Sequence, residues 1–558
     1  MSRSPPWLAA ATGAVVVLLT GAGALLLGQD ANWDLRNYHW YNPYAFLTDR
    51  FSIDVAAATY YNPLLDVPYY VVANALGARA TTFLLAAMQG CNFLVLYALA
   101  RRLCARWGTA GHLAIALVAF AGGGQLGLVG TTFYDNVVSL PLLAGLLMAL
   151  RALEAPTLRA SSLGFAAAGA LVGAAIGLKL PTAIYGVGFI VACLATSRSV
   201  PVAVSRTVSF GTTAALALAL FGGFWMWHLW STFHNPVYPY FNDLFGGEFG
   251  LSASYRDERF IPDSWQEALL FPFVLTFDPL QVGEVQFFDG RLPAFFVLLI
   301  VSGVLAFRGP GEPGDSKARF AAVVLVVSFV VWESLFAVYR YVITLEMLSP
   351  IVAAALIARW RVAARARAGV AIACAVIVVA TTRAGDWGHT EWRERTVEVE
   401  VPAIARPEAT LGLMAGFEPL SWVIPSFPPK IPFVRLQGYW NDPEDGDIGL
   451  TSSVRDRIDA HRGDLFLLYA ENERSLATRV LAAYGLETNF GECVAVRGNL
   501  AAGLRWCQVR RSIARGDGRR GSDPAVERAA RVRIALSPRL DDAPRMADGL
   551  QLDPLKTP

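Results

Sequence analysis

Long stretches without a charged residue are the feature that most constrains this chain. The first runs from Ser4 to Gln29, and apolar runs of similar character recur as far as Thr382. An α-helix needs about 20 apolar residues to cross the hydrocarbon core of a bilayer. Charged residues make up only 16% of the 558 residues, whereas soluble domains carry about 25%. The sequence therefore predicts a helical membrane protein and excludes an ordinary soluble enzyme, a disordered chain and a coiled coil.

We predict about eleven membrane-spanning helices. The first apolar run is longer than the core of a secretory signal peptide, so we expect it to stay in the protein. The predicted spans are Trp7–Gly28, Ala80–Ala100, His112–Thr131, Asn136–Leu153, Ala160–Leu178, Pro181–Thr196, Thr207–Trp230, Leu292–Phe307, Phe320–Phe336, Tyr341–Ala358 and Ala368–Thr382.

The charges between the predicted spans are segregated by sign. Arg and Lys fill alternate loops, and Asp predominates in the loops between them. Because basic loops stay on the cytoplasmic side, we expect a cytoplasmic N-terminus and, with an odd number of spans, a C-terminal part outside the cell membrane. The net charge is +2 and no basic stripe is present, so no nucleic-acid partner is expected.

Three parts of different composition follow one another along the chain. Residues 1–382 form the predicted membrane module, with long outer loops at 29–79 and 231–291 that are rich in aromatic residues, Asn and Pro. Short strand and helix patterns alternate over 383–511, which predicts a small α/β domain, and 512–558 has the composition of a disordered tail. Cys493 and Cys507 flank a predicted hairpin. In an oxidising compartment we expect them to form a disulfide, and the alternative is two buried thiols.

The first outer loop begins with two carboxylates. Asp30 and Asp34 follow the first span directly, so they are expected at the membrane surface, where a carboxylate can take a proton from a substrate hydroxyl. Tyr38, Tyr41 and Ala45 recur at helical spacing and predict a short interfacial helix. The alternative role of Asp34 is therefore to cap that helix.

Other polar residues fall at the predicted outer ends of helices. Lys179 and Arg340 are cations next to apolar spans, where charges are costly and commonly functional. The alternatives are that Lys179 extends to the membrane interface and that Arg340 pairs with Glu333 or Glu346. Asp135 opens the fourth span, either as a second acid or metal ligand or as a carboxylate favoured by the helix dipole.

Five short motifs on the predicted outer side resemble elements of the GT-C glycosyltransferases, in particular bacterial members similar to the mannosyltransferase-like glycosyltransferase family 87. The sequence departs from that pattern where Leu35 follows Asp34, since paired acids are common there, and where Leu180 separates Lys179 from Pro181. In chain order the motifs are Asp34 with Tyr38-His39, Tyr60-Tyr61-Asn62-Pro63-Leu64, Leu178-Lys179-Leu180-Pro181-Thr182, Asn235-Pro236-Val237-Tyr238-Pro239-Tyr240-Phe241-Asn242, and Tyr339-Arg340-Tyr341.

The resemblance implies transfer of a hexose or pentose at the outer, periplasmic face of the bacterial inner membrane. The donor would be a polyprenyl-phosphate sugar, and the acceptor a hydroxyl of a glycan, glycolipid or protein. Mg²⁺ or Mn²⁺ is compatible with Asp30, Asp34 and Asp135 as oxygen ligands, and the sequence leaves metal dependence open. The implied roles are general base for Asp34 or Asp30, donor-phosphate binding for Lys179 and Arg340, and substrate binding for Tyr38, His39, Tyr61 and Asp135.

Two other functions remain open at this level. A multispanning transporter of a lipid-linked or anionic solute is the main alternative, although the sequence has no matching halves of the kind that many transporters contain. A scaffold whose outer α/β domain binds a partner is the other possible function.

His39 either orients an acceptor or pairs with a carboxylate. The alternative is that it is a packed interfacial residue without a functional role.

Overall fold

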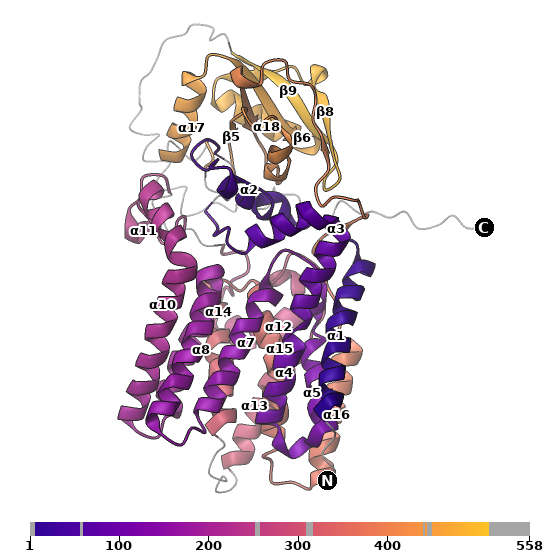
Figure 1. Cartoon of the computed structure of the whole chain (residues 1–558), viewed down its shortest axis with the longest axis vertical. Helices are drawn as coiled ribbons and strands as arrows, with labels where there is room; N and C mark the ends of the chain where they lie inside the picture. The colour runs from indigo at the N-terminus through magenta and orange to yellow at the C-terminus, as the bar shows by residue number, and fades with distance from the viewer. Residues whose placement is uncertain are drawn as a thin grey trace, which may run out of the picture. The chain divides into compact units, whose positions relative to one another are not determined.

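The computed structural model describes residues 6–55, 60–250, 257–307, 316–438, 441–443 and 449–512. These residues form a bundle of helices that leads into a small sheet domain near the C-terminus (Figure 1). This confirms the predicted fold class, a polytopic helical membrane protein with a C-terminal α/β domain. The predicted tail lies, from residue 513 onward, outside the described residues.

Eight helical segments in the described part of the chain are long and apolar enough to cross a membrane. The predicted number of spans stays a prediction, because shorter apolar helices accompany these eight. The helices of the bundle are α1 (Pro6–Leu27), α3 (Asp66–Gly90), α4 (Asn92–Leu103), α5 (Gly108–Phe120), α6 (Gly123–Gly127), α7 (Asp135–Ala152), α8 (Leu158–Leu178), α9 (Ala183–Thr196), α10 (Val200–Phe233), α12 (Trp265–Phe277), α13 (Arg291–Phe307), α14 (Ser316–Leu335), α15 (Ile343–Ile357) and α16 (Ala364–Thr381).

Two helical segments lie where the sequence predicted loop. Helix α3 begins at Asp66 rather than near Ala80 and kinks at Gly77, whose φ of 76° is a left-handed value that glycine adopts without strain. Its first turns carry polar and aromatic side chains, so they lack the hydropathy of a span. Helix α12 occupies part of the predicted loop 231–291, and it is too short to read as a full span.

Helices α8 and α10 approach each other closely through glycine. Gly169, Gly173 and Gly177 recur every fourth residue on α8, so they share one face. A Cβ at Gly173 would lie 2.1 Å from the carbonyl oxygen of Ala214, and one at Gly177 would lie 3.0 Å from the amide nitrogen of Gly222. Small residues at this spacing let membrane helices pack backbone to backbone, which fixes the two helices that form one wall of the site described below.

The C-terminal domain is built on a mixed sheet with the strand order β3-β8-β9-β6-β4-β5, in which β7 also pairs with β9. Strand β4 runs parallel to β5 and β6, whereas β6–β9, β9–β8 and β8–β3 are antiparallel. Cys493 and Cys507 are joined by a disulfide. The strands and the two helices packed with them are β3 (Val399–Glu400), β4 (Thr410–Met414), β5 (Phe433–Arg435), α17 (Gly449–Ala460), β6 (Asp464–Ala470), α18 (Arg474–Ala483), β7 (Leu486–Thr488), β8 (Val494–Gly498) and β9 (Leu504–Arg511).

The first loop of the membrane module is attached to this domain. Val55 forms a parallel bridge with Val434 and so extends the sheet beyond β5. Arg50 donates to the carbonyl oxygens of Pro429 and Ile431, and Asp54 accepts from the amide of Phe433. Figure 1 shows the intervening helix α2 (Tyr41–Leu47) beside this domain. The segment between α1 and α3 is therefore held from both ends, by the bundle and by the sheet.

Candidate active site

A π-helix positions the polar residues of the first loop. It covers Leu35–His39, and the amide of Trp40 donates to the carbonyl oxygen of Leu35 five residues earlier. Because each turn is wider than in an α-helix, residues four and five positions after Asp34 come to the same side as Asp34 itself. Asp34, Tyr38 and His39 accordingly line one cavity. Asp34 occupies the N-cap position without making the capping hydrogen bond, so its carboxylate faces the cavity.

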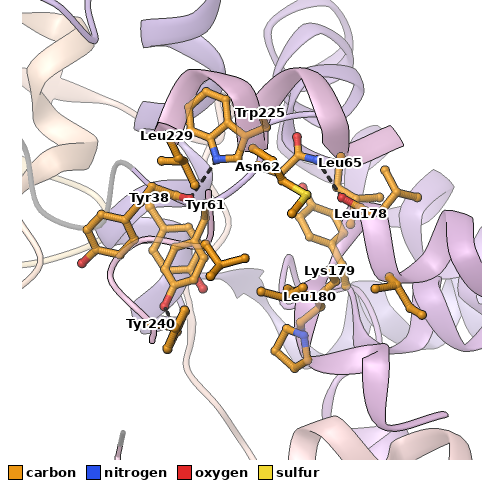
Figure 2. Close-up of a pocket in the computed structure, with 18 of the residues that line it drawn as sticks. Tyr38, Tyr61, Asn62, Leu65, Leu178, Lys179, Leu180, Trp225, Leu229 and Tyr240 are labelled. Carbon is orange, nitrogen blue, oxygen red and sulfur yellow. Dashed lines mark hydrogen bonds between the residues drawn. The ribbon is translucent and has the colours of Figure 1, made fainter. Parts of the chain in front are cut away.

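The cavity has an apolar part and a polar part. It measures about 960 Å³, including the portion that is open to solvent. Figure 2 shows Tyr38, Tyr61 and Tyr240 on one side and the turn Leu178–Leu180 on the other. Helices α8 and α10 supply the apolar wall, whose side chains are Ile176, Leu178, Leu218, Met226 and Leu229. A ligand with a long apolar chain and a polar head fits such a lining.

Arg340 is the centre of charge in the polar part. One guanidinium nitrogen lies 3.5 Å from a carboxylate oxygen of Asp34 and 3.8 Å from one of Asp135, and another lies 3.1 Å from Glu284. Its guanidinium carbon stands 4.0 Å from the centre of the Phe133 ring. Burial alone would raise the pKa of Glu284, but the charge of Arg340, together with hydrogen bonds from Arg340, from Trp387 and from the backbone, outweighs burial and lowers it.

The predicted partners of Arg340 were wrong. Glu346 instead accepts hydrogen bonds from the amides of Gly124 and Gln125 and from the hydroxyl of Tyr339. The first amides of α6 have no helical acceptors. The buried carboxylate of Glu346 accepts from those of Gly124 and Gln125, and Asp289 accepts from that of Gly123. Glu284, which lies in the second long loop, takes the place that the sequence assigned to Glu333 or Glu346.

Lys179 stands where α8 is broken. Pro181 has no amide hydrogen to donate to the carbonyl oxygen of Gly177, and its ring would clash with that carbonyl group in a continuing helix. Helix α8 therefore ends at Leu178, Lys179 adopts an extended conformation, and a 3-10 turn covers Leu180–Thr182. Its ammonium group donates to Asp135 at 2.6 Å and to the carbonyl oxygen of Phe133 at 2.7 Å. Lys179 is thus turned into the protein as part of the cavity lining and does not extend to the membrane interface.

Asp135 contacts both cations from outside the cavity. It opens α7, is 4% exposed and does not belong to the cavity lining. One carboxylate oxygen bonds Lys179, and the other lies 3.8 Å from Arg340. Asp135 therefore lies beside both cations and outside the cavity lining.

Asp30 lies apart from the cavity. One of its oxygens accepts from the amide and the side chain of Asn32, and the other accepts from the amide and the hydroxyl of Thr132. Its strand, β1 (Gln29–Asp30), pairs with β2 (His389–Thr390), which fixes it against the segment after α16. Both oxygens are engaged in holding the loop, so of the two predicted acids Asp34 is the one that faces the site.

His39 has a buried carboxylate partner that the sequence did not identify. Its Nδ1 lies 2.6 Å from Asp66, the first residue of α3, and both residues line the cavity. Tyr61 contacts Tyr240 through their hydroxyl groups at 3.2 Å. Burial, reinforced by the charge of Asp34, raises the pKa of Tyr38 well above its usual value, and burial does the same for Tyr61. Both phenols are therefore neutral donors at physiological pH.

The described residues contain no group of three or more His, Cys, Asp or Glu side chains arranged to hold a metal ion. The three acids that the sequence suggested as ligands are divided among separate tasks. Asp30 bonds Asn32 and Thr132, Asp135 bonds Lys179, and only Asp34 lines the cavity.

Comparison with known proteins gives fold-level likenesses only. No family model and no curated protein matches the sequence. Among solved structures, the chain is similar to ArnT from Cupriavidus metallidurans bound to undecaprenyl phosphate, with 15% identity and a TM-score of 0.45 over 67% of this chain and 63% of that one. The chain thus spans less than two thirds of the length of that protein.

A second likeness is to an oligosaccharyltransferase from Archaeoglobus fulgidus in its apo form, with 11% identity and a TM-score of 0.49 over 85% of this chain and 71% of that one. The archaeal oligosaccharyltransferase AglB from the same organism, in complex with an inhibitory peptide and a dolichol-phosphate, is similar at 10% identity and a TM-score of 0.45 over 85% and 70%. With TM-scores below 0.5, these likenesses support no inference about activity, which rests on the site itself.

Proposed function

We propose that the protein is a glycosyltransferase of the GT-C type, which moves a sugar from a polyprenyl-phosphate donor to an acceptor hydroxyl. The observation that carries this proposal is the cavity in which two cations, Lys179 and Arg340, stand at the polar end of an apolar wall formed by α8 and α10. A lipid phosphate has the matching distribution of charge and apolar surface. The five motifs that resemble this class meet at the same cavity.

The proposed chemistry assigns a role to each charged side chain. Lys179 and Arg340 bind the donor phosphate and stabilise the negative charge that grows on it as the bond to the sugar breaks. Asp34, next to Arg340, lies on the sugar side of the phosphate. There it either accepts the acceptor's proton or stabilises the positive charge that develops at the anomeric carbon. Tyr38, Tyr61 and Tyr240 offer hydroxyl groups and ring faces to the sugar.

The charge distribution supports a periplasmic location for the cavity. At the other end of the bundle, Lys317 bonds Glu154 at 2.6 Å and Arg106 donates to the carbonyl oxygen of Ala358. The same end carries most of the basic loop residues, and such loops stay in the cytoplasm. These residues are Arg101, Arg102, Arg106, Arg151, Arg159, Arg198, Lys317, Arg319, Arg359, Arg361, Arg365 and Arg367.

Binding of undecaprenyl phosphate to the purified full-length protein tests the proposal. Hydrogen bonds to charged groups contribute about 1.5–3 kcal/mol, so Lys179→Gln and Arg340→Gln should each raise the Kd roughly 10- to 150-fold. Lys430→Gln and Arg497→Gln remove matched charges from exposed positions in the C-terminal domain and should leave the Kd unchanged. Equal affinity in all four variants would contradict the assignment of the phosphate site.

Two further measurements address the reaction itself. Mass spectrometry of lipids that copurify with the protein should reveal a polyprenyl-phosphate sugar, which would name the donor. Incubation with that donor and membrane extract should yield a covalent product. In reconstituted vesicles, movement of the lipid without any covalent product would instead support a transporter.

A further inference from the structure

His39 and Asp66 form an imidazole–carboxylate pair inside the cavity. The proposed glycosyl transfer uses neither residue. The imidazole Nδ1 lies 2.6 Å from Asp66, and the two side chains are 11% and 2% exposed. The pair is assembled by two elements, since His39 ends the π-helix and Asp66 begins α3. A carboxylate at Nδ1 selects the imidazole form whose proton is on Nδ1, which leaves Nε2 as a proton acceptor.

Asp34 is already engaged at the other side of the site. Its carboxylate lies 3.5 Å from Arg340, which also holds Asp135 and Glu284. In that position the carboxylate is suited to stabilise positive charge at the anomeric carbon, and for that task it must stay ionised and cannot take up the acceptor's proton. The imidazole of His39 is a separate group. When it accepts a proton it becomes a cation, and the charge of Asp66 stabilises that cation.

We infer that His39, held by Asp66, is the catalytic base that accepts the proton of the acceptor hydroxyl, with Asp66 as its positioning residue; this inference rests on the proposed glycosyl transfer. The acceptor oxygen forms a bond to the anomeric carbon, and the bond from that carbon to the phosphate oxygen breaks with its electron pair. Polyprenyl phosphate leaves on Lys179 and Arg340, and the hydroxyl proton goes to Nε2 of His39. Asp34 then has the remaining role, stabilisation of positive charge at the anomeric carbon.

Several titratable groups face His39. Asp66 faces it from α3, Tyr134 from the turn before α7, and Tyr38 and Asp34 from its own segment; the ring centres of Tyr38 and Tyr134 are 4.3 Å and 5.0 Å away. Burial, reinforced by Asp34 and Asp66 respectively, raises the pKa of Tyr38 and of Tyr134 well above the usual value. Neither phenol therefore changes charge between pH 5 and 8.

The decisive variant is His39→Asn. Its amide nitrogen stands near the position of Nδ1 and keeps a donor for Asp66, whereas the acceptor Nε2 is lost. We expect kcat to fall about 10²- to 10⁴-fold, while the Kd for undecaprenyl phosphate stays within threefold. His234→Asn, at an exposed position, is the matched control.

Two other variants keep the test independent of folding. Asp66→Asn is isosteric and should also reduce kcat with little change in the Kd, because an amide no longer fixes the protonation of the imidazole. His39→Ala should regain at least tenfold in kcat with free imidazole. A His39→Asn protein with wild-type kcat would overturn the inference and leave the proposed function intact. A wild-type protein that neither binds undecaprenyl phosphate nor transfers sugar would remove the proposed function itself.

Discussion

Asp54 should decide whether the C-terminal domain holds the first loop in its active conformation. The side chain has no exposed surface, and its two oxygens accept from Arg50 at 2.7 and 2.8 Å, from the hydroxyl of Tyr41 at 2.7 Å and from the amide of Phe433 at 2.8 Å. Asp54→Ala removes this acceptor from the Tyr41 hydroxyl, the Phe433 amide and Nε of Arg50, while Arg50 keeps its bonds to the carbonyl oxygens of Pro429 and Ile431. Removal of one partner of a buried ion pair costs about 3–5 kcal/mol. Here this reduces the free energy that holds the loop against the sheet.

Hydrogen exchange at Val55 measures that attachment directly. The Val55 amide donates to the carbonyl oxygen of Phe433 at 2.8 Å. A loss of about 3–5 kcal/mol corresponds to a decrease in protection of roughly 10²- to 10⁴-fold. Asp54→Asn keeps an acceptor oxygen and should lose less, and Asp49→Asn, at an exposed position of the same loop, should lose nothing. If the Val55 amide in Asp54→Ala exchanged as slowly as in the wild type, the reasoning about this attachment would be refuted.

Three other substitutions test the charge balance and the packing of the site. Asp34→Asn should abolish transfer with expression intact, and normal product would contradict its catalytic role. Glu284→Gln should tighten undecaprenyl phosphate binding about fivefold, since removing a partly screened negative charge near the site contributes roughly 1 kcal/mol; weaker binding would refute this. Because the pKa of Glu284 is lowered in the folded protein, its contribution to stability is present above its unfolded pKa and is lost as pH falls, so the variant's melting temperature should depend less on acid pH. Gly173→Leu should destabilise α8 against α10 by about 1–3 kcal/mol or more, measured as a lower melting temperature, because its Cβ would meet the Ala214 carbonyl.

Much of the site could be predicted because membrane spans impose sidedness. Once Lys179, Arg340 and Asp34 were assigned to ends of helices on one side of the bundle, few arrangements remained that would keep them apart. The cations and the carboxylate do lie together. Hydropathy thus predicted which residues share one end of the bundle, although the partner of each cation depended on local packing.

The choice between Asp30 and Asp34 lay beyond the sequence. It depends on β1 pairing with residues 389–390, more than 300 positions away, and on the bond from Asp30 to Thr132. Asp66 was missed because the first turns of α3 contain Tyr69, Tyr70 and Asn74 and lack the hydropathy of a span. Glu284 was missed for a similar reason, since a single acid in a long polar loop carries no periodic signal.

The attachment of the loop also changes what the C-terminal domain is expected to do. From the sequence, residues 383–511 were predicted only as a small α/β domain, with a partner-binding role if the protein is a scaffold. In the structure, Val55, Arg50 and Asp54 bind the sheet within the same segment that carries Asp34 and His39. A loop that has lost these bonds gains conformational freedom, at a cost of about 1–2 kcal/mol for each residue that must be ordered again before reaction. If the protein is a glycosyltransferase as proposed, we therefore expect the domain to affect catalysis through the geometry of the first loop, and truncation should lower kcat for every acceptor.

The excess of carboxylates around Arg340 has a physical reason that links stability to substrate binding. Lys179 and Arg340 are largely removed from water, and unpaired buried cations would be strongly destabilising. Asp34, Asp135 and Glu284 neutralise them while the cavity holds no anion. These pairs are not equally tight: Asp135 bonds Lys179 at 2.6 Å, whereas Asp34 stands 3.5 Å from Arg340. An arriving phosphate would therefore displace Asp34 most easily, and the carboxylate released at that moment lies beside the sugar, where positive charge develops during transfer.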